Sequence, residues 1–423
     1  MLLIHTQQIS SRLDYAFKHI CTRILGVKVQ FTSVIEEFIG HQGPKISYGK
    51  QPMGKELFFN AHGLLSEQGF EDIEIDIQPW GEGVGFFPTS EKSGLPFDIF
   101  AATFYLLSRY EEYVPHLKDA MGRFPAEESL AYRGNFLQKP VIDQWAYRLK
   151  EVLLQQFPTM QFPPKSYQVH HLVDASRPFA YANRGFLRNF SGFFRDLGRL
   201  RIKQVIARCK VLLKLRKDPF DTFTWMMNNT KNSSSRLTVF FLLGEGFTFK
   251  EDINSKRENY RSLVKLVNDY NEVGLLFSYH SMDSEERLKE EKWRMEELTH
   301  RSLESAMNDR WVVKLPHFYR SLLELEINKD MTLVYQNHLG FRAGTCTPFL
   351  FYDLDYEIKT PLIIHPLAGR TSALTDRSAG EMESEVYALR DSVRSVNGTY
   401  SLLFTNCDFI AEQTFWKRFF TET

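Results

Sequence analysis

The sequence predicts an α/β protein in which a smaller mixed α+β domain precedes a larger parallel sheet or barrel. After residue 164, short apolar runs alternate with longer helical patterns, which is typical of successive βα units. Near that point Pro158, Pro163 and Pro164 interrupt the chain, and proline disfavours helix both at its own position and at the preceding one. We therefore predict domains at residues 1–164 and 165–423.

The elements of the first domain are expected to be short. A turn-rich stretch, PWGEGVGFFPTSEKSGLPFD, fills residues 79–98, and amphipathic helices are predicted around 99–112 and 141–157. Polar and aromatic groups are dense at Ser108–Tyr113 and at Asp143–Trp145. We expect these two groups to form an interface with the second domain, and sugar binding is the alternative.

The elements of the second domain give its fold class. Strands are expected at residues 167–173, 237–243, 273–279, 311–315, 331–335, 362–367 and 400–404, with helices at 256–269, 284–302 and 379–393. This order of about seven strands with intervening helices favours a parallel sheet or barrel. In such folds the chemistry collects at the carboxyl ends of the strands, so site residues are expected just after these runs.

Composition argues against several classes of protein. The 52 Lys and Arg residues balance 52 Asp and Glu residues, so no global positive field points to nucleic acid as a partner. The four cysteines are far apart and form no C-x-x-C pair, which argues against a structural zinc site and a disulfide framework. No apolar run approaches the ~18 residues of a membrane span, and the N-terminus lacks a signal-peptide pattern. We therefore expect a cytoplasmic protein.

One segment departs from this balance. Residues 184–217 carry eleven Lys and Arg residues and a single acid, Asp196. The phenylalanines interleaved with them are Phe186, Phe190, Phe193 and Phe194. The pattern predicts a basic helical insertion in the second domain. Such an insertion either packs on its own domain with a solvated basic face or makes a peripheral contact with an anionic membrane surface.

Two long stretches, residues 95–146 and 340–354, resemble a bacterial group of polysaccharide deacetylase-like proteins. In this group an uncharacterised N-terminal domain precedes a catalytic domain similar to carbohydrate esterase family four. The resemblance extends over nearly the whole chain, and it implies a distorted (β/α) barrel of about seven strands. It also implies a polysaccharide or acetylated sugar as the partner, or a protein partner in glycan biosynthesis.

The activity implied by the resemblance is metal-dependent removal of acetyl groups from sugars. One Asp and two His hold a divalent ion that activates water, an adjacent Asp acts as the base, and a further His protonates the leaving group. Asp174 matches the base, but Ser176 stands where the metal-binding Asp is expected. A neutral hydroxyl is a poor replacement for a carboxylate on such an ion.

Two histidine positions are also changed. In the stretch EVGLLFSYHS, Leu276 stands where the family has a metal-binding His, and His280 comes four residues later, ~13 Å along an extended strand. Thr405 stands where the general-acid His is expected. These replacements predict that the metal site of the family is lost, with relocation of one ligand to His280 as the alternative.

Two further residues match the family. His317, in the motif LPHF, matches a strand-end His and is the residual candidate metal ligand, although a structural His explains that position equally well. Arg342, in the motif GFR, matches an Arg that orients the catalytic Asp through a bidentate contact. We therefore predict a catalytic pair between Arg342 and Asp174.

Three functions remain open on this basis. The first is a catalytically degenerate deacetylase-like protein that needs no cofactor and binds a glycan or a protein partner. The second is an active deacetylase or other hydrolase with a rearranged site for zinc or a similar divalent metal, built from Asp174 and His317 with some of the histidines at 170, 171, 280 and 365. The third is a membrane-surface accessory of glycan assembly that attaches through residues 184–217.

Overall fold

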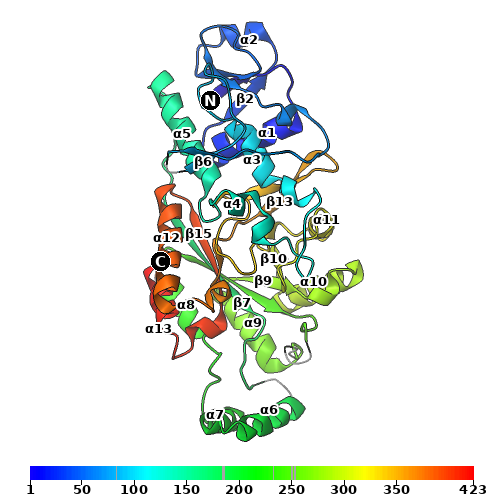
Figure 1. Ribbon diagram of the computed structural model, residues 1–423. Helices are drawn as coiled ribbons and strands as arrows, with labels where there is room; N and C mark the ends of the chain where they lie inside the picture. The colour runs from blue at the N-terminus through cyan, green and yellow to red at the C-terminus, as the bar shows by residue number, and fades with distance from the viewer. Residues whose placement is uncertain (82, 183–185, 232, 249–250, 252–253) are drawn as a thin grey trace.

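The molecule is elongated, with a small sheet near one end and a helical hairpin at the other (Figure 1). Two main sheets organise it: a four-stranded sheet near the N-terminus and a nine-stranded sheet formed after residue 167. The computed structural model describes residues 1–81, 83–182, 186–231, 233–248, 251 and 254–423.

The smaller sheet has the strand order β2-β1-β3-β4, and its three ladders are parallel. Its strands are β1 (Leu2–His5), β2 (Val29–Thr32), β3 (Lys45–Gly49) and β4 (Leu57–Asn60). Parallel neighbours need a crossover connection, and α1 (Ser11–Phe17) and α2 (Ile35–Gly40) lie in the first two crossovers. This sheet is therefore of the α/β type, which corrects the α+β class predicted for the N-terminal domain.

Three further helices join this sheet to the rest of the molecule. They are α3 (Ile99–Leu107), α4 (Leu130–Arg133) and α5 (Val141–Gln156), preceded by the antiparallel pair β5 (Gln78–Trp80) and β6 (Gly83–Gly85). Every residue of α3 is buried, and its N-cap Asp98 accepts hydrogen bonds from the N–H groups of Phe100 and Ala101. A helix that is apolar on all sides must be packed on all sides. The helix predicted at 141–157 is confirmed by α5, whereas the helix predicted around 99–112 is present as α3 but is shorter and buried on all sides instead of amphipathic.

The larger sheet has the order β12-β13-β11-β10-β9-β8-β7-β15-β14, and all its ladders except β12–β13 are parallel. Its strands are β7 (Gln168–Ala175), β8 (Arg236–Leu242), β9 (Glu272–Phe277), β10 (Ser305–Asn308), β11 (Lys329–Asp330), β12 (Phe349–Asp353), β13 (Ile358–Ile364), β14 (Gly369–Arg370) and β15 (Thr399–Thr405). The α/β class predicted for this part of the chain is confirmed.

Helices lie between and beside these strands. They are α6 (Phe186–Gly198), α7 (Ile202–Leu212), α8 (Phe223–Lys231), α9 (Glu258–Tyr270), α10 (Glu285–Thr299), α11 (His317–Glu324), α12 (Ala379–Ser395) and α13 (Thr414–Glu422). The predicted helices at 256–269, 284–302 and 379–393 correspond to α9, α10 and α12. None of the described helices combines the length and the apolar character that crossing a bilayer requires.

Side chains of the larger sheet meet in a compact apolar cluster. Its members are Leu172, Phe240, Leu242, Leu276, Met307, Trp311, Met331, Val334, Leu367 and Leu403. The parallel register places Leu276 beside Leu242 on one neighbouring strand and beside Met307 on the other. Leu276 is completely buried, and burying one leucine side chain stabilises a fold by roughly 1.5–3 kcal/mol. Its position is therefore that of a core residue.

Two predicted strands are wrong. Residues 311–315 and 331–335 are mostly buried, but they lie in irregular segments that follow β10 and β11. A short apolar run indicates burial without specifying the backbone conformation, which explains both errors. The strand β10 itself, SAMN, contains only two apolar residues and gives no strand signal.

The N-terminal region and the larger sheet are joined by buried polar contacts. Asp143 of α5 accepts hydrogen bonds from the hydroxyl groups of Thr345 and Thr347, each at 2.6 Å. Glu112 binds Arg342 in a two-bond ion pair. The interface predicted for Ser108–Tyr113 and Asp143–Trp145 is confirmed, and the domain boundary near residue 164 stays a prediction.

Candidate functional site

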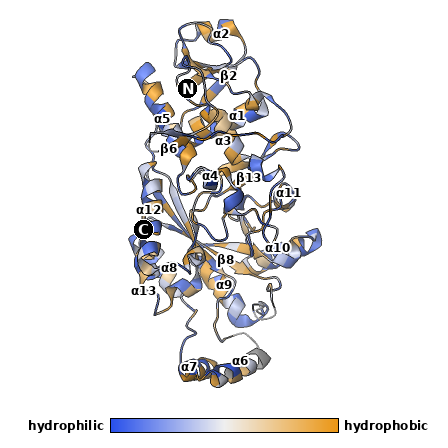
Figure 2. Cartoon of the chain, in the orientation of Figure 1, coloured by the Kyte–Doolittle hydropathy of each residue, from blue (hydrophilic) through white to orange (hydrophobic). Residues whose placement is uncertain are grey.

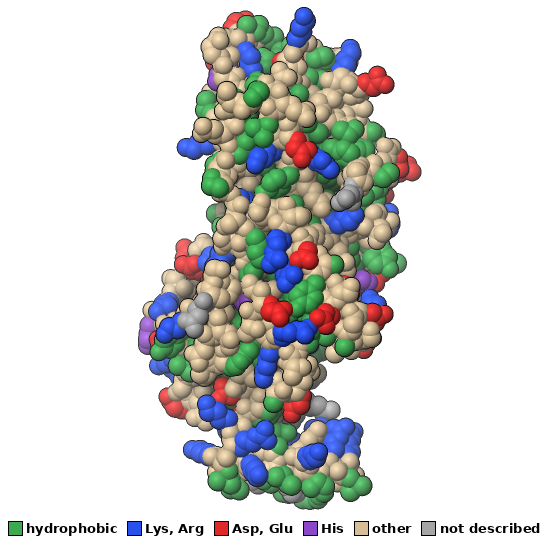
Figure 3. Space-filling model, turned by 90° about the vertical axis from the view of Figure 1, so that its left-hand side faces the viewer, with side chains coloured by type: hydrophobic (Ala, Val, Ile, Leu, Met, Phe, Trp, Pro, Cys, Tyr) green, Lys and Arg blue, Asp and Glu red, His purple; other side chains and the backbone are tan. Residues whose placement is uncertain are grey.

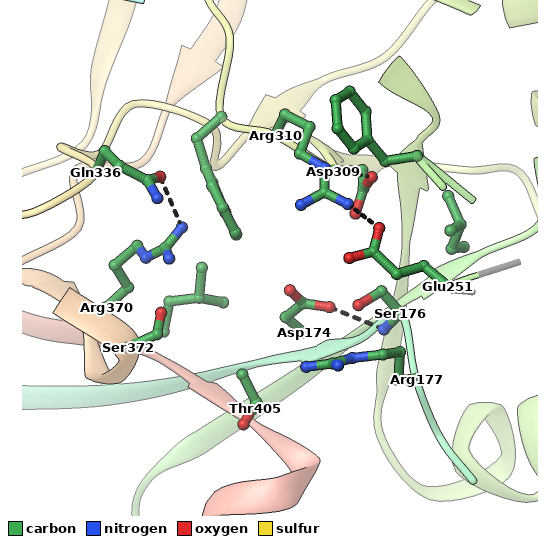
Figure 4. A pocket seen from close by; sticks show the side chains of 14 residues that line it. Asp174, Ser176, Arg177, Glu251, Asp309, Arg310, Gln336, Arg370, Ser372 and Thr405 are labelled. Carbon is green, nitrogen blue, oxygen red and sulfur yellow. Dashed lines mark hydrogen bonds and ion pairs between the residues drawn. The ribbon is translucent and has the colours of Figure 1, made fainter. Parts of the chain in front are cut away.

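A cavity of about 190 Å³ lies at the carboxyl ends of strands in the larger sheet, where parallel α/β folds bind their ligands. Figure 4 shows polar side chains converging on it from β7, from the segment after β10 and from the region of β14 and β15. The lining residues are Asp174, Ser176, Arg177, Leu242, Phe247, Glu251, Asp309, Arg310, Trp311, Gln336, Arg370, Ser372, Leu403 and Thr405. Three carboxylates and three guanidinium groups thus share one small cavity.

Asp174 and Asp309 supply two of the carboxylates. Asp174 is the penultimate residue of β7, and its Oδ1 accepts a hydrogen bond of 2.8 Å from the N–H of Ser176. Asp309 directly follows β10 and is 5% exposed. Burial raises the pKa of Asp309 to about 7, and the negative charges of Asp174 and Glu251 act in the same direction against the lowering effect of Arg310. This carboxyl group can therefore change its protonation state near neutral pH.

Arg310 forms the wall of the cavity opposite Asp174. Its guanidinium pairs with Glu251 and lies 4.4 Å from the centre of the Phe247 ring. Its Nε also lies 3.2 Å from Oδ2 of Asp309, although the angle does not make a hydrogen bond. Arg310 is thus held between two acids and an aromatic ring, and it connects the segments that carry them.

Arg370 and Trp311 form a second wall. The Arg370 guanidinium lies 3.6 Å from the centre of the Trp311 indole, a close cation–π contact. Its Nη1 donates a hydrogen bond of 3.1 Å to Oε1 of Gln336, which also accepts 2.7 Å from Arg123. Burial lowers the pKa of Arg370 to about 10, so the group remains a cation at neutral pH.

Several buried polar atoms of the lining have no hydrogen-bond partner in the described part of the chain. They are Oδ2 of Asp309, Nε of Arg310, Nε1 of Trp311 and Nε of Arg370. Buried polar groups are nearly always paired in folded proteins, because an unpaired one costs about 1–3 kcal/mol. Their concentration around one cavity is the arrangement expected of a site that pairs with a bound molecule.

The predicted site residues at the strand ends are divided between this cavity and the core. Asp174, Ser176 and Thr405 line the cavity, as their places at the carboxyl ends of β7 and β15 predict. Leu276 does not line it, because its side chain belongs to the apolar cluster. His280 is exposed in a short turn after β9, and its Nε2 lies 3.4 Å from the carbonyl oxygen of Phe247.

The predicted pair between Arg342 and Asp174 is wrong. Arg342 donates to Oε1 and Oε2 of Glu112 at 2.9 and 2.7 Å, and its Nη1 donates 3.3 Å to the carbonyl of Val334. Burial alone would raise the pKa of Glu112, but the positive charges of Arg342 and Arg109 outweigh it and hold that pKa at about 2. Arg342 therefore joins the two parts of the molecule in this structure.

His317 also lies outside the cavity. It is the first residue of α11 and is exposed, nine positions after the end of β10. The residues at the strand end itself are Asp309, Arg310 and Trp311. The prediction takes 311–315 for the strand, and that error places His317 at a strand end that the structure does not have.

The other candidate histidines do not gather around Asp174. His170 and His365 lie near each other, with ring centres 6.3 Å apart, and Nε2 of His170 is 2.8 Å from the hydroxyl of Thr238. His171 points elsewhere and stacks on Phe420 of α13 at 4.0 Å. Burial lowers the pKa of both His170 and His171 to about 3, so both rings are neutral.

The donor set at the cavity does not fit the metal centre that the resemblance implies. Ser176 and Thr405 offer hydroxyl groups where a carboxylate and an imidazole are expected, and Leu276 offers no donor atom. A divalent ion of this kind is held by several carboxylate or imidazole ligands together. Across the described residues, no group of three or more His, Cys, Asp or Glu side chains is arranged to hold a metal.

Sequence reasoning misses more than half of the polar groups at the cavity. Glu251, Asp309, Arg310, Gln336 and Arg370 are absent from the predicted site. For Asp309 and Arg310 a usable signal exists, because a charged pair directly follows a short buried segment. Gln336 follows an irregular segment and Arg370 belongs to a strand of two residues, and nothing in their local sequence distinguishes them.

Comparison with known proteins gives a match to a family model and distant structural likenesses. A family of unknown function, DUF7033, matches residues 2–158. A crystal structure described as that of a "putative polysaccharide deacetylase from Mycobacterium smegmatis" is 13% identical, with a TM-score of 0.40 over 62% of this chain and 85% of that one. No curated protein matches the chain. The family match covers the N-terminal region alone, and a TM-score this low assigns no function.

Proposed function

We propose that this protein binds a carbohydrate in the cavity at the strand ends and does so without the metal centre of the deacetylases that its sequence resembles. The observation that carries the proposal is the composition of the cavity. Its carboxylates, guanidinium groups and indole N–H are suited to hydrogen bonds with a polar molecule. The core residue Leu276 occupies the position of one metal-binding side chain of the resembled family.

The chemistry of the lining suits a sugar. Each hydroxyl group of a sugar both donates and accepts, so it pairs with carboxylates such as Asp309 and with guanidinium groups such as Arg370. Trp311 and Phe247 add aromatic surface for the C–H faces of the ring. The cavity of about 190 Å³ is smaller than the ~300–1,000 Å³ of sites for drug-sized molecules, which suits one sugar residue at a chain end.

We also propose that the larger sheet closes into the distorted barrel that the resemblance implies. The segment around residues 365–370 supports this, because it forms hydrogen bonds with β11 and with β15, which lie toward opposite ends of the strand order. The N–H of His365 donates to the carbonyl of Asp330 in β11, and the N–H of Ala368 donates a hydrogen bond of 2.7 Å to the carbonyl of Ser401 in β15. Leu367 and Leu403 meet in the same apolar cluster.

Calorimetric titration of the full chain tests sugar binding. The probes are tri-N-acetylchitotriose and tri-galacturonic acid, each in buffer with EDTA. We expect binding of at least one probe, weakened about 10- to 100-fold by Asp309→Asn and by Arg370→Gln, because each substitution removes a charged hydrogen-bonding group. The control is Arg148→Gln, an exposed residue on α5 that should leave the affinity unchanged.

Metal content distinguishes this proposal from a rearranged active site. The purified chain is incubated with zinc, nickel, cobalt or manganese, desalted and analysed by inductively coupled plasma mass spectrometry. We expect no retained metal in the wild type. Near-stoichiometric metal that disappears in His317→Ala would instead establish the alternative of an active metal-dependent deacetylase, and hydrolysis of acetylated sugars would then be the function to assay.

A further inference from the structure

The two helices α6 and α7 form a hairpin that projects from the end of the molecule farthest from the N-terminal sheet (Figure 1). The chain enters it after β7 and leaves it before α8. Residues 184 and 185 of the predicted insertion 184–217 lie outside the described residues. Most of the remainder lies in α6 and α7, and the residues from 190 to 217 whose burial is described are largely exposed.

The hairpin exposes an unusual number of large apolar side chains. Of the 23 that are exposed in the described residues, nine fall within the 26 positions from 190 to 215. They are Phe190, Phe194, Leu197, Leu200, Ile202, Ile206, Leu212, Leu213 and Leu215. Figure 2 shows hydrophobic residues on both helices of the hairpin. Apolar surface gathered in this way usually marks a docking site for another molecule.

Positive charge lies beside this apolar surface. Residues 184–217 hold eleven Lys and Arg residues, and their single acid, Asp196, is bound to Arg208 across the two helices at 2.6 Å. Both of these side chains are buried, so the one acid is used to join the helices. Lys, Arg and hydrophobic side chains gather together at the lower end of the molecule in Figure 3.

The base of the hairpin is fixed to the body. The carboxylate of Asp218 accepts hydrogen bonds from the N–H groups of Ala180, Tyr181 and Ala182, at 2.7 to 2.9 Å. The chain entering the hairpin is thus tied to the chain leaving it. Arg208 of α7 also lies 4.7 Å from the centre of the Tyr181 ring. The two ends of the hairpin are therefore held beside each other, and α7 contacts the chain that leads into it.

We propose that the hairpin docks on the surface of an anionic lipid bilayer. Amphipathic helices that bind such surfaces combine large apolar residues, which enter the boundary between headgroups and acyl chains, with Lys and Arg, which face anionic headgroups. The hairpin has both features at the same end of the molecule. The proposal stands on the hairpin alone and does not depend on the ligand of the cavity.

Two other occupants fit the hairpin less well. A nucleic acid would satisfy the positive charge but leave Leu213, Leu215 and the other exposed apolar side chains in water. A second copy of the chain would cover apolar surface but bring together two segments that each carry ten net positive charges, eleven less one. An anionic bilayer satisfies both the charge and the apolar surface.

Docking through the hairpin would also bring the cavity toward the membrane. Ser176 and Arg177 line the cavity and lie in the short segment that leads from β7 to the hairpin. Asn406, beside the cavity-lining Thr405, donates hydrogen bonds to the carbonyls of Arg177 and Phe220 at both sides of the hairpin base. A ligand at a membrane surface would therefore reach the cavity close to the hairpin that attaches the protein to the membrane.

Vesicle co-sedimentation of the full chain tests the proposal. Vesicles of pure phosphatidylcholine are compared with vesicles that hold ~30% phosphatidylserine, each across a range of salt concentrations. We expect binding to the anionic vesicles alone, lost at high salt because electrostatic attachment is screened. Equal binding to both kinds of vesicle, or no binding to either at low salt, would overturn the proposal.

Matched variants show whether the hairpin is responsible. Lys210→Glu with Lys214→Glu should weaken vesicle binding by at least thirtyfold, since each basic residue near the surface contributes about a fivefold change. Lys265→Glu with Lys289→Glu changes the net charge equally on the exposed faces of α9 and α10 and should have little effect. Equal loss in the two double variants would show a nonspecific response to net charge and would contradict docking through the hairpin.

The apolar contribution has its own pair of variants. Leu213→Ser with Leu215→Ser should reduce vesicle binding by tenfold or more while leaving the thermal midpoint unchanged, because both side chains are exposed. Leu266→Ser with Trp293→Ser, also exposed but on α9 and α10, should not reduce it. Binding to a 20-base-pair DNA duplex in place of vesicles, or hairpin-dependent dimerisation without vesicle binding, would assign the surface to a different occupant.

Discussion

Two arginine-rich regions of this molecule differ in how completely their hydrogen bonds are made. Around Arg342, each charged group has its partner: Glu112 accepts from Arg342 and from Arg109, and Arg109 also binds Glu111. Around Arg370, buried atoms of Asp309, Trp311 and Arg370 itself make no hydrogen bond in the described part of the chain, although Asp309 has an ion-pair contact with Arg310. The charged groups of the first region are paired within the protein, whereas the second region keeps buried polar atoms that are not hydrogen-bonded to the described part of the chain.

The difference distinguishes charged residues that hold the fold together from charged residues that remain available to a ligand. A buried ion pair with all of its donors and acceptors paired joins the N-terminal region to the larger sheet, and it has no capacity left for a ligand. A cavity with unpaired donors and acceptors stores unfavourable free energy that a ligand can relieve. The family resemblance assigns Arg342 to the functional site. The buried atoms without hydrogen bonds instead assign Arg370 to it.

The largest effect is expected from breaking the complete region. Glu112→Ala leaves two buried guanidinium groups with fewer partners and should reduce the free energy of unfolding by about 3–5 kcal/mol. Urea denaturation at pH 7 measures this loss. The control is Glu151→Ala, whose exposed pair with Arg148 should contribute no more than about 1 kcal/mol. Similar values for the two variants would contradict the structural role of Glu112.

The pH dependence of that contribution follows from its sign. The folded-state pKa of Glu112, about 2, lies below the ordinary value of 4.5. Its stabilisation is therefore fully present above pH 4.5 and is lost as the pH falls toward 2. The destabilisation caused by Glu112→Ala should shrink over that interval.

Asp309 should show the opposite dependence. Its folded-state pKa of about 7 lies above the ordinary 3.8, so the folded state holds the proton more tightly and stability falls as the pH rises from about 4 to 7. Asp309→Asn removes this penalty and should stabilise the empty protein by up to about 4 kcal/mol at pH 8, with little gain at pH 4. Thermal unfolding at both pH values measures it. A destabilised variant at pH 8 would show that the ion-pair contact with Arg310 outweighs the cost of burying the carboxylate.

A smaller effect is expected at Leu276. Leu276→His places a polar ring in the apolar cluster and should cost about 1–3 kcal/mol of unfolding free energy without creating zinc binding. Leu276→Met keeps the apolar character and a similar volume, so it should cost less than about 1.5 kcal/mol. A stable histidine variant that binds zinc would show that the position still faces a metal site.

The smallest effect on stability is expected at the hairpin. Lys210→Glu alters an exposed residue of α7 and should change the free energy of unfolding by less than about 0.5 kcal/mol. Chemical denaturation measures this change. The variant thus distinguishes the hairpin, where charge serves docking, from the Glu112 region, where charge serves folding. A loss of several kcal/mol would mean that the hairpin packs on the body as a structural element.

The sequence predicts the part of the fold that depends on long periodic patterns. Five predicted strands and the helices α9, α10 and α12 are confirmed, because alternation of apolar runs with amphipathic helices is repeated over many residues. The two wrong strands are short buried runs, in which burial and strand conformation look the same. The wrong strand at 311–315 also causes an error in the predicted site residues, because it moves the expected strand end from Asp309 to His317.

The site itself is only partly predictable. Asp174, Ser176 and Thr405 lie at the ends of long strands that the sequence marks well, and they line the cavity. Arg370 reaches the cavity through β14, a strand of two residues. The partner of Arg342 lies 230 positions away in Glu112, so no local pattern could have named it. Long-range pairing of this kind is set by the packing of the two regions.

The central claim is that the cavity binds a sugar without a metal. Titration of the full chain with tri-N-acetylchitotriose and tri-galacturonic acid, first in EDTA and then in excess zinc, tests it most directly. We predict the same dissociation constant in both conditions and a 10- to 100-fold weaker one in Arg370→Gln. Binding or hydrolysis that requires zinc would contradict the account and would return the cavity to the metal-dependent chemistry of the family that the sequence resembles.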